Sequence, residues 1–174
     1  MKQHAIALTL AAAVLLSACS PQYDWRDYRS NDAPYAVLFP GKPATQTRKV
    51  QLDGIEVEMT MTAAEVNEVV FAVGSAQVAD PAQAPAAIEA MRSALVKNIG
   101  GTVINSKSSP PASGSTRQTM LEVEAAGSQN GQPMLLMGRF IAKDKRIYQV
   151  IVMGRQKNIV QETVETYFSS FKLN

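Results

Sequence analysis

The chain has 174 residues, of which 46% are hydrophobic, and its 17 lysine and arginine residues nearly balance its 15 aspartate and glutamate residues. This balance argues against nucleic acid or a strongly anionic surface as the main partner. The single histidine, His4, and the single cysteine, Cys19, both precede residue 20, so the rest of the chain lacks the side chains for a Ser-His-Asp triad, a Cys-His pair or an ordinary zinc site.

The first segment has the pattern of an export signal. Lys2 precedes an apolar run from Ala5 to Leu16 that is broken only by Thr9. As a helix this run would be roughly 18 Å long, which is too short for a hydrocarbon core of roughly 30 Å. A basic start followed by a short apolar stretch is typical of a secretory signal peptide.

The sequence Leu16-Ser17-Ala18-Cys19 resembles the bacterial lipobox. That resemblance implies cleavage between Ala18 and Cys19, with a lipid attached to the cysteine. The alternative is an ordinary signal peptide followed by an incidental cysteine, but Leu16 is unusual at the outer cleavage-determining position. We expect a signal peptide over residues 1–18 and a lipid-anchored protein of the bacterial envelope that faces the periplasm. Ser20, in place of an aspartate, favours the outer membrane over the inner one.

Residues 19–34 are polar and end in a turn signal, which indicates a short lipidated tether before a single domain over residues 35–174. Aromatic and arginine side chains gather in this tether and suit a partner surface; they are Tyr23, Trp25, Arg26 and Tyr28. The alternative is that Trp25 folds back and attaches the tether to the domain.

The first part of the domain has the period of strands. Residues 35–39 (YAVLF) predict one strand, and residues 48–64 predict a hairpin that turns at Asp53-Gly54 and alternates apolar with polar side chains. Residues 69–76 predict a further, more central strand because most of their side chains are apolar.

The period then changes to that of a helix over residues 82–99. Ile88, Met91, Leu95 and Ile99 recur at spacings of three and four, as on one face of an amphipathic helix. Asp80-Pro81 is a favoured helix start, and Gly100-Gly101 is a stop signal.

The second half predicts more strands and a closing helix. Its expected elements are a short strand over 102–107, a loop over 108–115, strands over 117–126, 134–142 and 146–153, a turn over 127–131, and a helix over 158–171. Strands joined mainly by hairpins indicate an antiparallel sheet. We therefore expect an α+β domain of about six to seven strands with one internal and one C-terminal helix.

Three short motifs resemble the PsbP-like fold, over roughly residues 35–173. They are Phe39-Pro40-Gly41-Lys42-Pro43, Arg146-Ile147-Tyr148 and Ser170-Phe171-Lys172-Leu173. This fold occurs in the PsbP subunit of photosystem II, in a nuclear Ran-binding import factor and in many bacterial lipoproteins. The stretch DWRDY with FPGKP also looks like a set of small proteobacterial lipoproteins. The resemblance implies a non-enzymatic binding or assembly domain, and no functional residue transfers from it.

Two carboxylate pairs suggest hydrolase chemistry as an alternative. Glu56 and Glu58, like Glu122 and Glu124, lie at i and i+2 on predicted strands, which places each pair on one face about 6.5 to 7 Å apart. That spacing is compatible with paired-carboxylate hydrolysis. Alternation alone also explains these residues, because it puts charged side chains on the solvent face.

Met59 and Met61 share the opposite face of the same predicted strand. Thioether sulfur binds Cu(I), so a methionine copper site is a further alternative, whereas core filling is the simpler interpretation. Taken together, the residues predict a lipid-anchored, non-catalytic binding or accessory assembly domain with a protein partner, no nucleic acid and no cofactor. A small-molecule or Cu(I)-binding lipoprotein and a carboxylate hydrolase remain the alternatives.

Overall fold

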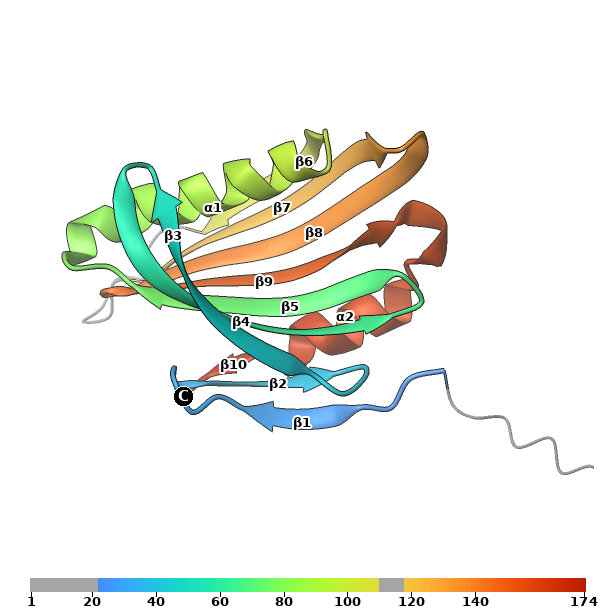
Figure 1. Ribbon diagram of the computed structural model, residues 1–174, viewed down its shortest axis with the longest axis horizontal. Helices are drawn as coiled ribbons and strands as arrows, with labels where there is room; N and C mark the ends of the chain where they lie inside the picture. The colour runs from blue at the N-terminus through green and yellow to red at the C-terminus, as the bar shows by residue number, and fades with distance from the viewer. Residues whose placement is uncertain (1–21, 110–117) are drawn as a thin grey trace, which may run out of the picture.

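The computed structural model describes residues 22–109 and 118–174 (Figure 1). The expected signal peptide, Cys19, residues 110–115 of the expected loop and the first residue of the expected strand over 117–126 lie outside the described residues. In the described part of the chain, none of the helices combines the length and the hydrophobicity of a membrane-spanning helix.

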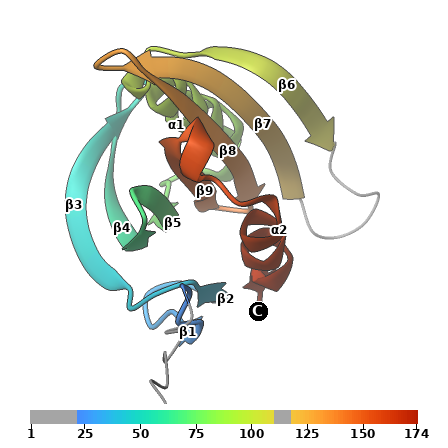
Figure 2. The ribbon, with the colours of Figure 1, turned by 90° about the vertical axis from the view of Figure 1, so that its right-hand side faces the viewer.

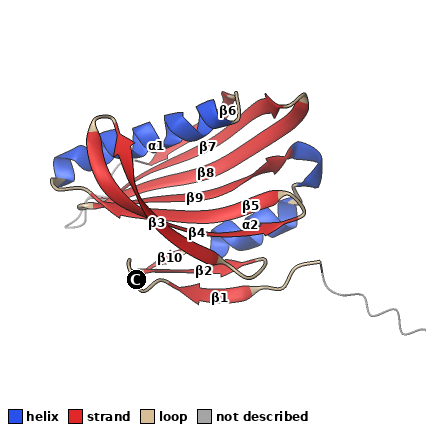
Figure 3. Cartoon of the chain, in the orientation of Figure 1, coloured by secondary structure: helices blue, strands red, loops and turns tan. Residues whose placement is uncertain are grey.

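Two antiparallel sheets form the framework (Figure 3). The large sheet has seven strands in the order β3-β4-β5-β9-β8-β7-β6, and the small sheet has the order β1-β2-β10. The strands of the large sheet are β3 (Ala44–Leu52), β4 (Ile55–Val66), β5 (Val69–Gln77), β6 (Thr102–Ser109), β7 (Gln118–Gln129), β8 (Gln132–Lys143) and β9 (Arg146–Arg155). Those of the small sheet are β1 (Arg26–Arg29), β2 (Tyr35–Phe39) and β10 (Lys172–Leu173).

Helices cover both faces of the large sheet. They are the short η1 (Pro81–Gln83), α1 (Ala84–Asn98), the short η2 (Gln156–Asn158) and α2 (Gln161–Ser170). In Figure 1, α1 lies above the strands, while α2 and the small sheet lie below them. The expected α+β class with one internal and one C-terminal helix is confirmed, and β1 and β10 of the small sheet are strands that the sequence did not predict.

Each covered face has its own core. The core on the α1 side is mainly aliphatic and includes Ile88, Met91, Leu136 and Ile147. The core on the α2 side, called here the aromatic core, combines aliphatic side chains with a cluster of aromatic ones that includes Tyr35, Phe39, Phe71, Tyr148 and Tyr167. Strand β9 is almost continuously apolar because its alternating side chains enter both cores, as expected for a strand buried on both faces.

Part of the expected tether belongs to the folded structure. Residues 26–29 form β1, which pairs antiparallel with β2 from Arg26 opposite Phe39 to Arg29 opposite Ala36. In β1 only Tyr28 is half-buried, and the other three residues are exposed. A four-residue strand with one inward side chain has too little alternation to be recognised from its sequence.

The expected turn over residues 127–131 is shorter in the structure. Strand β7 continues to Gln129, and the turn is formed by Asn130 and Gly131, with φ of 51° and 74°. Gly127 lies within the strand, at a position where a Cβ would stand 2.2 Å from the carbonyl oxygen of Ile99. This glycine therefore permits a close approach between β7 and the end of α1, and it does not form the turn.

The two helices begin later than expected. Asp80 caps η1 through a capping box with Gln83, and α1 follows from Ala84. Helix α2 begins at Gln161, and Val160 is an extended N-cap residue that is 42% exposed. Val160 therefore does not share the buried helical face expected for it. Strand β6 extends to Ser109, two residues into the expected loop.

Candidate binding groove beside the terminal helix

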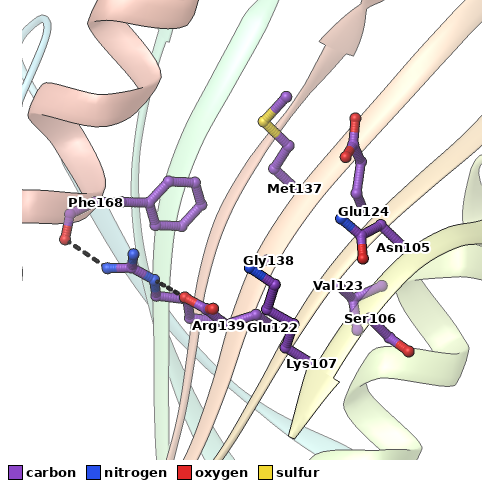
Figure 4. Close-up of a pocket in the computed structure, with 10 residues that line it drawn as sticks. All are labelled: Asn105, Ser106, Lys107, Glu122, Val123, Glu124, Met137, Gly138, Arg139 and Phe168. Atoms are coloured by element: carbon purple, nitrogen blue, oxygen red, sulfur yellow. Dashed lines mark hydrogen bonds and ion pairs between the residues drawn. The ribbon is translucent and has the colours of Figure 1, made fainter.

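Among the described residues, no helix covers the outer strands of the large sheet on the α2 side. Figure 2 shows α2 and the small sheet below the central strands, with β6 outside them at the edge. All eight residues of β6 are exposed. Beside α2 the uncovered strands form a groove of about 170 Å³, and its lining residues are Asn105, Ser106, Lys107, Glu122, Val123, Glu124, Met137, Gly138, Arg139 and Phe168 (Figure 4).

Strand register places the charged side chains of this groove in rows. Glu122 lies opposite Lys107 of β6 and opposite Arg139 of β8. Two residues along, Glu124 lies opposite Asn105 and opposite Met137. Because side chains two residues apart share a face of a strand, both glutamates point into the groove, as their spacing predicts.

Arg139 is the most constrained side chain of the groove. Its Nε donates to Oε1 of Glu122 at 2.8 Å, and its Nη1 donates to the carbonyl oxygen of Phe168 at 2.9 Å. The guanidinium carbon also lies 4.9 Å from the centroid of the Phe168 ring, within range of a cation–π contact. Arg139 thus connects β7, β8 and α2, and its positive charge is offset by Glu122.

The other groove residues have unused binding capacity. Among the described residues, neither Glu124 nor Lys107 forms an ion pair. Asn105 lies beside Glu124, while Met137 and Phe168 supply apolar surface. The groove therefore offers a carboxylate, an amide, an ammonium group and two apolar side chains next to an exposed edge strand. This combination suits the recognition of an extended polypeptide.

The second carboxylate pair lies elsewhere. Glu56 and Glu58 are exposed on β4 and line a separate polar hollow of about 470 Å³ that also contains Asp32 and Arg146. Glu56 accepts a hydrogen bond of 2.9 Å from Lys49 on the neighbouring strand. This is the arrangement expected for a solvent face. In the described ranges, no group of three or more His, Cys, Asp or Glu side chains is placed to hold a metal ion.

Met59 and Met61 both belong to the core on the α1 side. Met59 is 5% exposed, and Met61 is half-buried against the same core. The sulfur of Met61 accepts a hydrogen bond of 3.3 Å from Nε2 of Gln149. Gly74 makes this contact possible, because a Cβ at that position would stand 2.6 Å from the same sulfur. The structure therefore places both methionines in packing contacts.

Two of the four tether residues pack onto the domain. Trp25 and Tyr28 contact the aromatic core, and the Tyr28 ring lies 5.7 Å from that of Phe39. Tyr23 stays half-buried beside Trp25, and Arg26 forms an exposed ion pair with its neighbour Asp24. Trp25 thus attaches the segment to the domain, whereas Arg26 remains at the surface.

A hydroxyl cluster joins the small sheet to the large one. The hydroxyls of Tyr28, Thr45 and Thr62 lie within 3.0 to 3.4 Å of one another, and Tyr35 donates to Thr62 at 3.4 Å. Burial raises the pKa of Tyr35 to about 12, an effect that the Thr62 hydrogen bond partly offsets.

Two further tyrosines are buried without such a cluster. Burial raises the pKa of the Tyr148 hydroxyl, and nearby Arg146 opposes that rise. Burial also raises the pKa of Tyr167 well above its ordinary value. Each of these phenols is therefore held in its neutral form.

Sequence reasoning did not single out Arg139 or Phe168. The available signal was a lone arginine within the apolar run MLLMGRFIA of β8. Its partners could not be read from the run, because Glu122 and Phe168 meet it through strand register and through the packing of α2.

Comparisons with known proteins identify the fold. No family model matches the chain, and no curated protein matches it in sequence. The chain is similar to the solution structure of cyanobacterial PsbP (CyanoP) from Synechocystis sp. PCC 6803, with a TM-score of 0.53, 12% identity, and coverage of 87% of this chain and 94% of that one. At this identity the likeness shows the fold alone. The PsbP-like fold expected from the three motifs is thereby confirmed.

Two structures from Pseudomonas aeruginosa match with lower TM-scores. One is protein PA94, of unknown function, with a TM-score of 0.35, 10% identity, and coverage of 77% of this chain and 85% of that one. The other is the immunity protein TplEi of T6SS, with a TM-score of 0.36 and 14% identity over 70% of this chain. The match spans 46% of TplEi. At these TM-scores neither match bears on function.

Proposed function

We propose that this chain is a lipid-anchored lipoprotein of the bacterial cell envelope, of the proteobacterial type, whose PsbP-like domain binds a protein partner without catalysing a reaction. The observation that carries the anchor is the sequence Leu16-Ser17-Ala18-Cys19, which ends seven residues before β1 begins at Arg26. Several acyl chains on one cysteine hold a protein stably, since each buried CH₂ contributes about 0.8 kcal/mol.

The groove beside α2 supports the binding role. It is open, it lies next to an exposed edge strand, and it combines the charges of Glu124 and Lys107 with the apolar surface of Met137 and Phe168. An extended segment of a partner protein could pair with β6 through its backbone and place alternate side chains in this groove. A partner in the periplasm follows from the proposed anchor.

The anchor is tested by Cys19→Ser. We expect wild-type protein to be acylated, processed and membrane-bound, and the variant to remain an unprocessed or mislocalised precursor, as measured by mass spectrometry and fractionation. Ser20→Ala is the matched control and should leave acylation intact. Ser20→Asp should move acylated protein from the outer to the inner membrane in an enteric-type host. Unchanged processing and membrane retention of Cys19→Ser would rule out the anchor.

The binding role is tested by photo-cross-linking in intact envelopes. A photoreactive residue replaces Asn105 in the groove or, as a control, the exposed Gln46 on the opposite edge strand. We expect a discrete protein adduct from position 105 that Glu124→Lys removes, and no such adduct from position 46. Identical products at both positions, or none at position 105, would contradict binding in the groove.

A further inference from the structure

The short connection between the anchor and the domain restricts which end of the domain can meet the membrane. Gln22, the first described residue, follows Cys19 by three positions in the chain. At about 3.6 Å per residue these span roughly 11 Å at most. If Cys19 carries the lipid, as in the proposed function on which this inference rests, Gln22 lies within that distance of the acylated residue.

The chain after Gln22 is held to the domain. The backbone N–H of Asp24 donates to the carbonyl oxygen of Pro40 at 3.0 Å, Trp25 packs against the aromatic core, and Arg26 begins β1. The start of the described chain is therefore fixed at one end of the molecule, on the right in Figure 1. The turn between β3 and β4 lies at the other end of β4, a strand of 12 residues and so roughly 36 Å away.

Gln22 lines a shallow surface hollow at this end, which we name the anchor-proximal surface. Its residues are Gln22, Asn67, Glu68, Lys157, Asn158 and Val160. They come from the start of the described chain, the turn between β4 and β5, η2 and the entry into α2. Two segments that are distant in the sequence, residues 67–68 and 157–160, thus lie beside the start of the described chain.

The charge of this surface favours a phospholipid headgroup layer. The negative charge of Glu68 is offset by an ion pair of 3.2 Å between its Oε1 and Nη2 of Arg155. Its Oε2 also accepts a hydrogen bond of 3.1 Å from Nδ2 of Asn158. Lys157 is exposed and forms no ion pair within the described ranges. A lysine ammonium close to a membrane surface is attracted to anionic headgroups, by about 1 kcal/mol for each such residue.

The surface also carries an exposed apolar side chain. Val160 is 42% exposed, and it is one of three exposed large hydrophobic residues in the described part of the chain, with Val103 and Ile104. A valine beside a lysine and neutral amides can enter the boundary between headgroups and acyl chains, whereas it gains nothing from exposure to water.

We propose that the anchor-proximal surface rests on the phospholipid bilayer, with Lys157 at the headgroups and Val160 at their boundary with the acyl chains. The lipid on Cys19 and this surface then form two points of attachment. The domain consequently has a defined orientation, with the turn between β3 and β4 directed away from the membrane.

Single-cysteine labelling tests the orientation, because Cys19 would carry lipid and not the label. Val160→Cys and, at the far end, the exposed Gln51→Cys are labelled with an environment-sensitive fluorophore. The lipidated protein is reconstituted in vesicles of phosphatidylethanolamine and phosphatidylglycerol that contain headgroup-labelled quencher lipids. We expect blue-shifted emission and at least twofold stronger quenching at position 160 than at position 51.

Mass spectrometry and vesicle flotation of the same samples separate the two hypotheses. Absence of lipid on Cys19 would overturn the proposed anchor and this inference with it. Acylated, floating protein with equal quenching at both positions, or stronger quenching at position 51, would overturn the orientation alone. A weaker signal from Val160→Cys when Lys157→Gln is added would be further support, and soluble unlipidated protein should show no difference between the positions.

Discussion

The carbonyl oxygen of Phe168, in the last turn of α2, accepts a hydrogen bond of 2.9 Å from Nη1 of Arg139 on β8. The last four carbonyl groups of a helix lack partners within the helix, and a cation there also interacts favourably with the helix dipole. Since Arg139 is held by Glu122 as well, one side chain forms the boundary between the groove and the covered part of the sheet.

Arg139→Met should therefore destabilise the domain by about 2 kcal/mol, because it removes two charge-assisted hydrogen bonds and leaves Glu122 half-buried without a partner. Glu122→Gln should cost at most about 1 kcal/mol, since Arg139 keeps its bond to α2. Urea unfolding measures both. Lys49→Met in the exposed pair with Glu56 is the control, expected to cost below about 0.5 kcal/mol. If Arg139→Met lowered the free energy of unfolding by no more than Lys49→Met does, Arg139 would not stabilise the contact between β7, β8 and α2.

Removal of one buried hydroxyl should stabilise the protein. Tyr167 is fully buried, and its hydroxyl has no hydrogen-bond partner among the described residues. Because an unsatisfied buried polar group costs about 1 to 3 kcal/mol, Tyr167→Phe should raise the free energy of unfolding by about 1 kcal/mol. Tyr35→Phe is the matched control, whose hydroxyl donates to Thr62, and it should lower that energy by about 0.5 to 1 kcal/mol. If both substitutions changed the free energy of unfolding in the same direction, the Tyr167 hydroxyl would not be the unsatisfied group that this prediction assumes.

Stability should fall at alkaline pH. An unfolded tyrosine loses its proton near pH 10, whereas the folded pKa of Tyr35 is about 12 and that of Tyr167 is raised well above its ordinary value. From pH 10 upwards the unfolded chain releases these protons and the native state retains them. The stabilisation is complete below pH 10 and is lost as pH rises toward 12, by about 1.4 kcal/mol per pH unit for each such tyrosine.

The double variant Tyr35→Phe with Tyr167→Phe serves as the comparison for this pH dependence. Its free energy of unfolding, measured in urea at intervals between pH 9 and pH 11, should decline less steeply than that of the wild type. Parallel curves would show that these phenols titrate alike in the folded and unfolded chain.

A glycine in the strand should tolerate substitution less well than a glycine in the turn. An Ala side chain at Gly127 would meet the Ile99 carbonyl oxygen at 2.2 Å and the Gly101 backbone at 2.8 Å. Gly131→Ala meets no atom within 4 Å and is strained only by its φ of 74°, which costs about 1 to 2 kcal/mol. We expect Gly127→Ala to cost at least about 2 kcal/mol, since backbone must move. Thermal unfolding of both variants compares them, and a larger loss for Gly131→Ala would refute the packing argument.

The strands and helices with strong periodicity follow from the sequence alone. Residues 35–39 form β2 with the expected bounds, and Asp53-Gly54 forms the expected hairpin turn, with φ of 50° and 81°. Both follow from local physics, because alternation defines the buried face of a strand and only certain residues adopt positive φ without strain. The exposed Glu56 and Glu58 and the buried Met59 of β4 follow from the same alternation. Further along β4 the alternation fails, because Thr60 and Thr62 are buried on the face that carries the exposed glutamates.

Tertiary packing alone decided the features that depend on a distant partner. Strand β1 has one inward side chain and exists because β2 offers a pairing edge. Gly127 has the local signature of a turn, yet the approach of Ile99 keeps it within β7. Arg139 acquires its role from Glu122 and Phe168, which are 17 and 29 residues away in the chain. Local sequence determines backbone preference and the inward face of each element, whereas contacts between distant elements depend on register and on the docking of α2.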